Sequence, residues 1–138
     1  MLTADPFDFS WMTGRHVQIS FSEPETWFVM FGDSLCLNVE CPWRLIHDGV
    51  IAISSDDHRQ QFGLPAPIDA AEHATSLLAG LAVERVEVRE GTADLFIHFE
   101  RDWRLEIIPF SSGYESWQVS TPSGKSVVAQ GGGQLSAW

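Results

Sequence analysis

The most pointed cluster of chemically capable side chains is Tyr114-Glu-Ser-Trp117. Glu115 could act as a general acid or base beside an aromatic wall that binds an apolar or planar group. Along a strand, Tyr114 and Glu115 point to opposite faces, so Trp117 shares the face of Glu115 and can simply pack there. We favour the packing interpretation and keep Tyr114, Glu115 and Trp117 as ligand-binding candidates.

His98 is the fourth ligand-binding candidate. It lies between Ile97 and Phe99 and has Phe96 as its neighbour on the face opposite those apolar side chains. That face is either a pocket or an interface, or it simply holds a histidine with satisfied hydrogen bonds in a partly covered sheet. The last interpretation is the favoured one.

Cys41 and His47 suggest a thiolate and imidazole pair or a metal site, with Cys36 or His16 as further members. Their spacing matches no dense ligand set. Five positions of extended chain span about 16 Å, so Cys36 and Cys41 cannot form a disulfide within one strand. We therefore predict two free thiols and neither a metal nor a cofactor.

The glycine run Gly131-Gly-Gly133 is not a phosphate-binding loop, because no Lys follows it and no helix opens after it. It predicts a tight bend. The sequence contains no Gly-x-Ser-x-Gly, His-Glu-x-x-His or Cys-x-x-Cys motif, and we predict no catalytic residues.

The charge of the chain limits its partners. Eight Lys and Arg stand against 19 Asp and Glu, which gives a net charge of -11. Binding to nucleic acid or to an anionic membrane needs clustered cations, so both are disfavoured, and a basic partner or plain solubility is favoured. No apolar run approaches the about 20 residues of a membrane span, and the first residues lack a signal-peptide pattern. We expect a cytoplasmic protein.

Two similar stretches organise the chain. The segment from Trp27 to Glu40 and the segment from Asp94 to Pro109 each read as a strand, a turn and a strand. At a constant offset, every second position is apolar in both, and the matched pairs are Trp27 with Leu95, Val29 with Ile97, Phe31 with Phe99, Leu35 with Trp103, Leu37 with Leu105 and Val39 with Ile107.

Alternation and turn residues predict ten strands, five in each half. They are 16–22, 26–31, 34–40, 43–47 and 50–54, then 83–89, 94–99, 103–108, 114–120 and 126–130, with a closing segment 134–138. The fold class is mainly β (β-rich α+β): two similar antiparallel five-strand meanders joined by one helix, arranged about a pseudo-two-fold as a sheet or a barrel-like form. We expect a single domain over 1–138, with an internal duplication of 16–54 and 83–130. Residues 55–82 supply the linker and helix.

The single predicted helix runs from about Asp69 to Ala79. Asp69 can cap its start, and Gly80 can end it. Its apolar stripe is Ala70, Ala74, Leu77 and Leu81, and Glu72, His73, Thr75 and Ser76 are expected to turn away.

The apolar positions of the two hairpins should form the core, with Leu77 and Leu78 against them. The segment from Trp27 to Phe31 is apolar at every position, which predicts that both of its faces are covered. Phe28, Met30 and Phe96 add apolar surface on the opposite sheet face, so we predict an interface there and a possible homodimer.

The last third of the chain resembles a family of small bacterial proteins of unknown function. The resemblance rests on Tyr114-Glu-Ser-Trp117, the Gly132-Gly133 pair and the closing Trp138, together with Val86, Val88, Leu95, Ile97, Phe99, Leu105, Ile107 and Gly124. It covers roughly the last sixty residues. It implies a compact β-rich protein with no established activity, transfers no catalytic residue, and suggests an association with toxin-immunity gene neighbourhoods.

Two functions from different classes are compatible with these observations. The first is a non-catalytic binding protein, an immunity-like partner whose acidic surface meets a basic protein. The second is a small-molecule pocket or weak enzyme between the two repeats that uses Glu115, Trp117 and His98. We rank binding above catalysis because catalytic motifs are missing.

Overall fold

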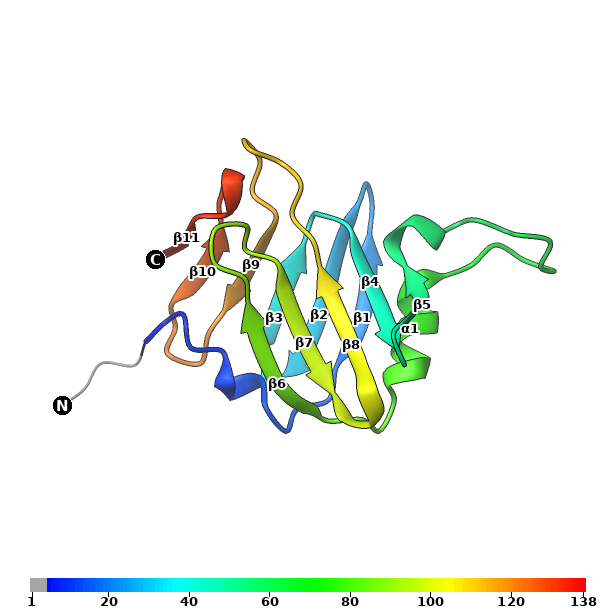
Figure 1. Ribbon diagram of the computed structural model, residues 1–138, viewed down its shortest axis with the longest axis horizontal. Helices are drawn as coiled ribbons and strands as arrows, with labels where there is room; N and C mark the ends of the chain where they lie inside the picture. The colour runs from blue at the N-terminus through cyan, green and yellow to red at the C-terminus, as the bar shows by residue number, and fades with distance from the viewer. Residues whose placement is uncertain (1–4) are drawn as a thin grey trace.

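The computed structural model describes residues 5–138, and it consists of two antiparallel β-sheets with one helix at their side (Figure 1). Residues 1–4, part of the segment expected to lack a signal-peptide pattern, lie outside the described residues. The strands are β1 (Gln18–Ser22), β2 (Thr26–Gly32), β3 (Leu35–Val39), β4 (Trp43–His47), β5 (Val50–Ser54), β6 (Val83–Val88), β7 (Leu95–Phe99), β8 (Trp103–Ile107), β9 (Trp117–Ser120), β10 (Ser126–Ala129) and β11 (Leu135–Ala137). The helix is α1 (Ala70–Leu78), and four short 3-10 turns are η1 (Ser10–Met12), η2 (Ser55–Asp57), η3 (Glu100–Asp102) and η4 (Gly131–Gly133).

The ten predicted strands are present, and the closing segment adds β11. Sheet A has the order β1-β2-β3-β9-β10-β11, and sheet B has the order β5-β4-β8-β7-β6. The prediction of two five-strand meanders is therefore wrong in one respect. The first half of the chain gives β1 to β3 to sheet A and the hairpin β4–β5 to sheet B, and the second half gives β6 to β8 to sheet B and β9 to β11 to sheet A.

The chain changes sheets within three residues after β3. The amide of Glu40 donates to the carbonyl of Ser116 beside sheet A at 2.9 Å, and the carbonyl of Pro42 accepts from Ile108 beside sheet B at 2.9 Å. Proline has no amide hydrogen, so Pro42 cannot extend a ladder alongside β3. The strand that follows pairs with β8 instead.

Both sheets remain open, so the barrel-like alternative is not the one adopted. Helix α1 packs against the edge of sheet A at β1. The Thr75 hydroxyl accepts a hydrogen bond from the amide of Ile19 and donates one to its carbonyl, at 2.9 and 3.1 Å. The prediction that Thr75 turns away is therefore wrong, because it satisfies backbone groups that an edge strand leaves unpaired.

The predicted ends of the helix are confirmed. An Asp69 carboxylate oxygen accepts from the amide of Glu72 at 3.1 Å, and Gly80 follows the helix with φ of +78°. A side-chain oxygen at the first position and a left-handed residue after the last turn satisfy backbone groups that the helix cannot pair itself.

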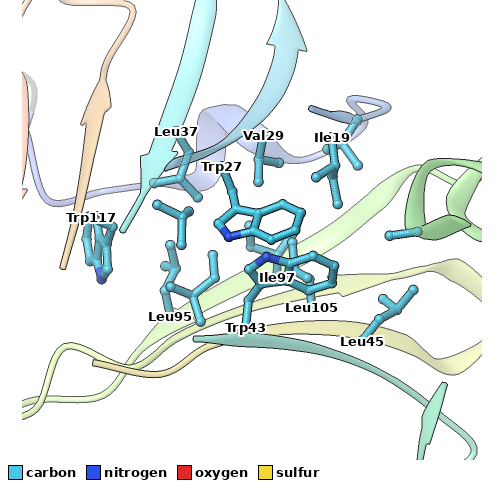
Figure 2. Packing of buried hydrophobic residues seen from close by; sticks show 14 of the residues in the cluster. Ile19, Trp27, Val29, Leu37, Trp43, Leu45, Leu95, Ile97, Leu105 and Trp117 are labelled. Carbon is cyan, nitrogen blue, oxygen red and sulfur yellow. The ribbon is translucent and has the colours of Figure 1, made fainter. Parts of the chain in front are cut away.

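The core lies between the two sheets. Figure 2 shows Trp27 of sheet A against Trp43 of sheet B, and their ring centroids lie 5.1 Å apart in an edge-to-face arrangement. The predicted core residues Val29, Phe31, Leu37, Val39, Ile97, Phe99, Leu105 and Ile107 are all buried, as is Leu78, whereas Leu35 and Leu77 are half-buried. The period-two pattern of the two hairpins thus identified the inward faces correctly.

The three predicted interface residues do not form one patch. Phe28 and Met30 point outward from sheet A, and Phe96 points outward from sheet B, so the two sheets and the core separate them. All three are half-buried. Both faces of the segment from Trp27 to Phe31 were predicted to be covered. The helix lies at the edge of sheet A, beside β1, and so covers the outer side of β2 only at the border of the sheet.

Among the described residues, we find no helix with the length and apolar character that crossing a membrane would require.

Replacing Phe99 by Ala should lower the free energy of unfolding by about 3–5 kcal/mol, because the side chain is 1% exposed and its loss leaves a cavity between the sheets. Urea titration followed by tryptophan fluorescence measures this. Phe110→Ala is the matched control: that side chain is 79% exposed, and its removal should change stability by less than about 0.5 kcal/mol. Equal effects of the two substitutions would show that the assignment of the inner face is wrong.

Candidate functional site

The connection between β8 and β9, residues 108–116, is an exposed aromatic loop. It projects beyond the ends of the strands (Figure 1) and carries Phe110 and Tyr114, which are 79% and 82% exposed. The predicted strand 114–120 begins only at Trp117, because the Ser111 hydroxyl accepts hydrogen bonds from the amides of Gly113 and Tyr114 at 3.0 and 2.9 Å. These bonds fold the segment into a turn.

The three-glycine turn η4 supports the aromatic loop. The amide of Gly132 donates to the carbonyl of Ser111 at 3.0 Å. A Cβ on Gly131 would lie 2.5 Å from the backbone of Gly113, and a Cβ on Gly133 would lie 2.5 Å from the carbonyl oxygen of Gly91. The predicted tight bend is confirmed, and the reason for glycine here is the close approach of two neighbouring loops.

Two grooves flank Phe110. One, of about 560 Å³, is lined by Glu40, Cys41, Pro42 and the aromatic loop, including Tyr114 and Glu115. The other, of about 460 Å³, lies across Phe110 and Pro42 and includes Asp56 and Asp94. A third, of about 230 Å³, shares Glu40, Cys41, Pro42 and Asp56 and adds Glu25. We call these three the acidic grooves.

The carboxylates of the acidic grooves are Glu25, Glu40, Asp56, Asp94 and Glu115. None of them forms an ion pair with another residue in the described part of the chain. The two arginines at the grooves are engaged elsewhere, Arg44 with Glu106 and Arg59 with Glu23. The grooves therefore present uncompensated negative charge next to exposed aromatic rings.

Cys41 lies where the acidic grooves meet, but its thiol is not activated. Burial raises its pKa to about 12, a backbone hydrogen bond from Ile108 opposes this, and Asp94 raises the pKa further. A thiol that keeps its proton is a poor nucleophile and a poor metal ligand. His47 does not assist it, because the imidazole stacks on Trp103 at 4.0 Å between ring centroids. Cys36 and Cys41 are both free, as predicted.

Trp117 packs in the core, as the favoured interpretation predicted. It is 2% exposed, and its indole N–H donates to the carbonyl of Ala93 at 2.9 Å. Figure 2 shows it at the margin of the core cluster.

His98 points outward from sheet B, beside a charged network. Burial lowers the pKa of its imidazole, and Arg85 and Arg104 lower it further. The neighbouring Glu106 carboxylate is buried and accepts from the Nε atoms of Arg44 and Arg104 at 2.7 and 2.6 Å. Arg44 contacts Glu106 across neighbouring strands and Arg104 contacts it along β8, which provides a structural explanation for the charges on this face.

The structure separates the four ligand-binding candidates. Tyr114 and Glu115 share one acidic groove, Trp117 lies in the core, and His98 lies on the outer face of sheet B. Sequence reasoning missed Glu40, Asp56, Asp94 and Phe110. Only Phe110 gave a local signal, because an aromatic residue in Pro109-Phe-Ser-Ser-Gly113 occurs between turn-forming residues. The described residues include no group of three or more His, Cys, Asp and Glu arranged to hold a metal ion.

Comparison with known protein families places this fold and site in context. Residues 7–138 match the model of DUF6188, a family of unknown function. The chain belongs to this family. The match covers both sheets and the aromatic loop, and it extends well beyond the last sixty residues on which the sequence resemblance rested. A search of curated proteins found no match, and a search of solved structures found none either.

Replacing Gly131 by Ala should destabilise the protein by about 1–3 kcal/mol, because the new methyl group would collide with the backbone of Gly113. Gly113→Ala is the matched control on the other side of the contact, since a Cβ there meets nothing within 4 Å. Urea titration of both variants measures the difference. Equal stability would mean that η4 and the aromatic loop are not in close contact.

Raising the pH above 9 should reduce the stability of the wild-type protein more than that of Cys41→Ser. The unfolded thiol loses its proton near its ordinary pKa of 9.0, whereas the folded thiol keeps its proton up to about pH 12. The unfolded state then binds fewer protons, so the free energy of unfolding falls through this window by at most about 1.4 kcal/mol per pH unit. Urea titrations at about pH 8 and pH 10.5 test this. Parallel losses in both proteins would contradict the burial of Cys41.

Proposed function

We propose that the chain is a non-catalytic binding module that contacts a basic protein through the aromatic loop and the acidic grooves. The observation that carries this proposal is the combination of two highly exposed aromatic rings with carboxylates that lack cationic partners in the described residues.

Exposed aromatic rings are the natural anchors of such a contact. Phe110 and Tyr114 lie on either side of a serine and glycine turn. Aromatic side chains contribute strongly to interfaces because they bury a large area with few rotatable bonds, and they attract Arg and Lys through cation–π contacts. A partner with cationic side chains would meet both features.

The carboxylates add selectivity and a fast encounter. In a chain of net charge -11, Glu40 and Glu115 line the same groove as Tyr114. Opposite charges steer a basic partner to this end of the molecule and repel acidic proteins.

The aromatic loop is held in place before any partner binds. Its hydrogen bonds to Ser111 and its close contact with η4 restrict its movement. Loops that are ordered in advance lose less conformational entropy on binding.

An immunity-like role is the narrower form of this proposal. An acidic surface with aromatic anchors is suited to covering the cationic site of a toxic enzyme that acts on an anionic substrate. The same proposal includes two expectations from the sequence, that the protein is bacterial and that it is cytoplasmic.

A small-molecule pocket or weak enzyme between the repeats has less support. Glu115, Trp117 and His98 would have to converge, and they lie in an exposed loop, in the core and on an outer sheet face.

The internal duplication and the single-domain organisation also remain proposals. Two observations favour duplication. The strand order β1-β2-β3-β9-β10 parallels β6-β7-β8-β4-β5, and the two hairpins have the same register, with Phe28 opposite Asn38 and Phe96 opposite Glu106.

A photo-crosslinking amino acid in place of Tyr114, expressed in cells of the source organism, should capture a recurrent basic protein. The same amino acid at Phe62, which is 67% exposed on another loop, is the positional control. With the purified partner, Phe110→Ser and Glu115→Gln should each weaken binding at least about tenfold, and Phe62→Ser should not. Raising the salt from about 0.05 to 0.5 M should weaken binding as well. Identical capture at both positions, an acidic partner, or salt-independent binding would refute the proposal.

A further inference from the structure

We infer that the outer face of sheet A is the contact surface of a homodimer in which two copies pack this face against each other. The outward side chains are those that alternate with the inward core positions of β1, β2, β3, β9, β10 and β11. They define what we call the uncharged face: Gln18, Ser20, Ser22, Thr26, Phe28, Met30, Cys36, Asn38, Gln118, Ser120, Ser126 and Ser136. Val128, the remaining outward position, is already buried within one chain.

The absence of charge on this face is unusual for this chain. Charged residues make up 20% of the sequence, and a solvated sheet face normally carries a good share of them. No side chain of the uncharged face, as the described residues define it, is Asp, Glu, Lys or Arg.

Sheet B provides an internal comparison, because its central hairpin has the same register. On sheet A, Met30 lies opposite Cys36 and Phe28 lies opposite Asn38. At the corresponding places on sheet B, His98 lies opposite Arg104 and Phe96 lies opposite Glu106. A solvated face of this architecture therefore accepts charged side chains readily, whereas the face of sheet A has no Asp, Glu, Lys or Arg at the matched positions.

The uncharged face is also hollowed. A groove of about 1010 Å³ lies where the outward side chains of β1 to β3 meet the end of helix α1. Phe28, Met30 and Cys36 contribute to its lining, and the one charged lining residue, Arg15, is paired with Asp33 at the border of the face. Phe28 and Met30 are only half-buried within one chain. Apolar side chains in such a recess gain from being covered.

A second copy of the chain is the occupant that the charge pattern favours. In a two-fold dimer, every residue near the axis lies close to its own copy, so any charged residue there would face a like charge. Two chains of net charge -11 repel each other least where neither contributes a charge, so an uncharged surface is the favoured place for them to associate. A basic partner, in contrast, would be matched by carboxylates, which this face lacks and the acidic grooves provide.

The area of the uncharged face determines how strong the dimer is expected to be. Strands lie about 4.8 Å apart and rise about 3.3 Å per residue, so six strands of these lengths make a face of roughly 450 Å² in projection. Two such faces bury roughly 900 Å² before the relief of the side chains is counted, which is near the lower end for specific complexes. The dimer is therefore expected to be weak and dependent on concentration.

Analytical ultracentrifugation of the full chain from about 1 to 500 µM should show a reversible equilibrium between monomer and dimer. Gln118→Glu and Asn38→Asp place one negative charge at the two central strands, β9 and β3, with almost no change in shape. Each should weaken dimerisation at least about tenfold, because the new charge faces its copy across the axis. Circular dichroism verifies that both variants stay folded.

Gln60→Glu is the matched control, since it makes the same chemical change at an exposed position of the loop before α1. It should leave the dimer unchanged. A strictly monomeric protein over the whole concentration range would overturn the inference, and so would a dimer that Gln118→Glu and Gln60→Glu affect equally.

Salt separates this inference from the proposed binding of a basic protein. High salt screens the repulsion between two acidic chains, so it should leave the dimer intact or strengthen it, whereas it should weaken the contact at the acidic grooves. A dimer that dissociates at high salt would contradict an uncharged interface. Because the two contacts use different residues, Gln118→Glu can abolish one and Glu115→Gln the other independently.

Discussion

The burial of Trp27 against Trp43 joins the two sheets, and the rest of the structure depends on that contact. One ring comes from β2 in sheet A and the other from β4 in sheet B, and both are almost fully buried. Both strands come from the first half of the chain. They lie in different sheets because β4 and β5, which follow β3 in sequence, join the sheet of β8. Each sheet is thus completed by strands from the other half of the chain. Neither half can unfold without breaking the sheet of the other, which favours cooperative unfolding.

This packing constrains only every second side chain. Inward positions must be apolar in both sheets, and they are, whereas the outward positions are free to serve other purposes. Sheet B uses them for a neutralised network around Glu106, and sheet A uses them for a surface without charge. Five carboxylates that have no ion-pair partner in the described residues line the acidic grooves. The molecule therefore separates three chemically different surfaces on one scaffold.

Local signals in the sequence were sufficient for the strands and the helix, but not for their arrangement. The alternation around Val29 and Ile97 is a property of neighbouring residues, and the structure confirms the strands that it predicts. Which strand joins which sheet depends on pairings between distant segments, such as β3 with β9, that no local pattern encodes.

The candidate site was harder to predict for the same reason. Glu40, Asp94 and Glu115 come from three separate segments and meet only in the folded chain. Tyr114 and Glu115 were predicted to lie in a strand but lie in a loop, because the Ser111 hydroxyl competes for the amides that a strand would use. The matching positions of Phe28 and Phe96 in the two similar hairpins suggested one patch, although the hairpins lie in different sheets.

The separation of surfaces makes the two proposed contacts compatible. The aromatic loop projects from the ends of the strands, whereas the uncharged face is the outer side of sheet A (Figure 1). A dimer formed through that face would therefore leave both aromatic loops free. Such a dimer would present two acidic sites at a fixed separation. A basic partner that is itself dimeric would then bind both sites, and its second contact would form at a high effective concentration. Weak self-association and charge-steered binding would therefore reinforce each other without any contact between the two surfaces.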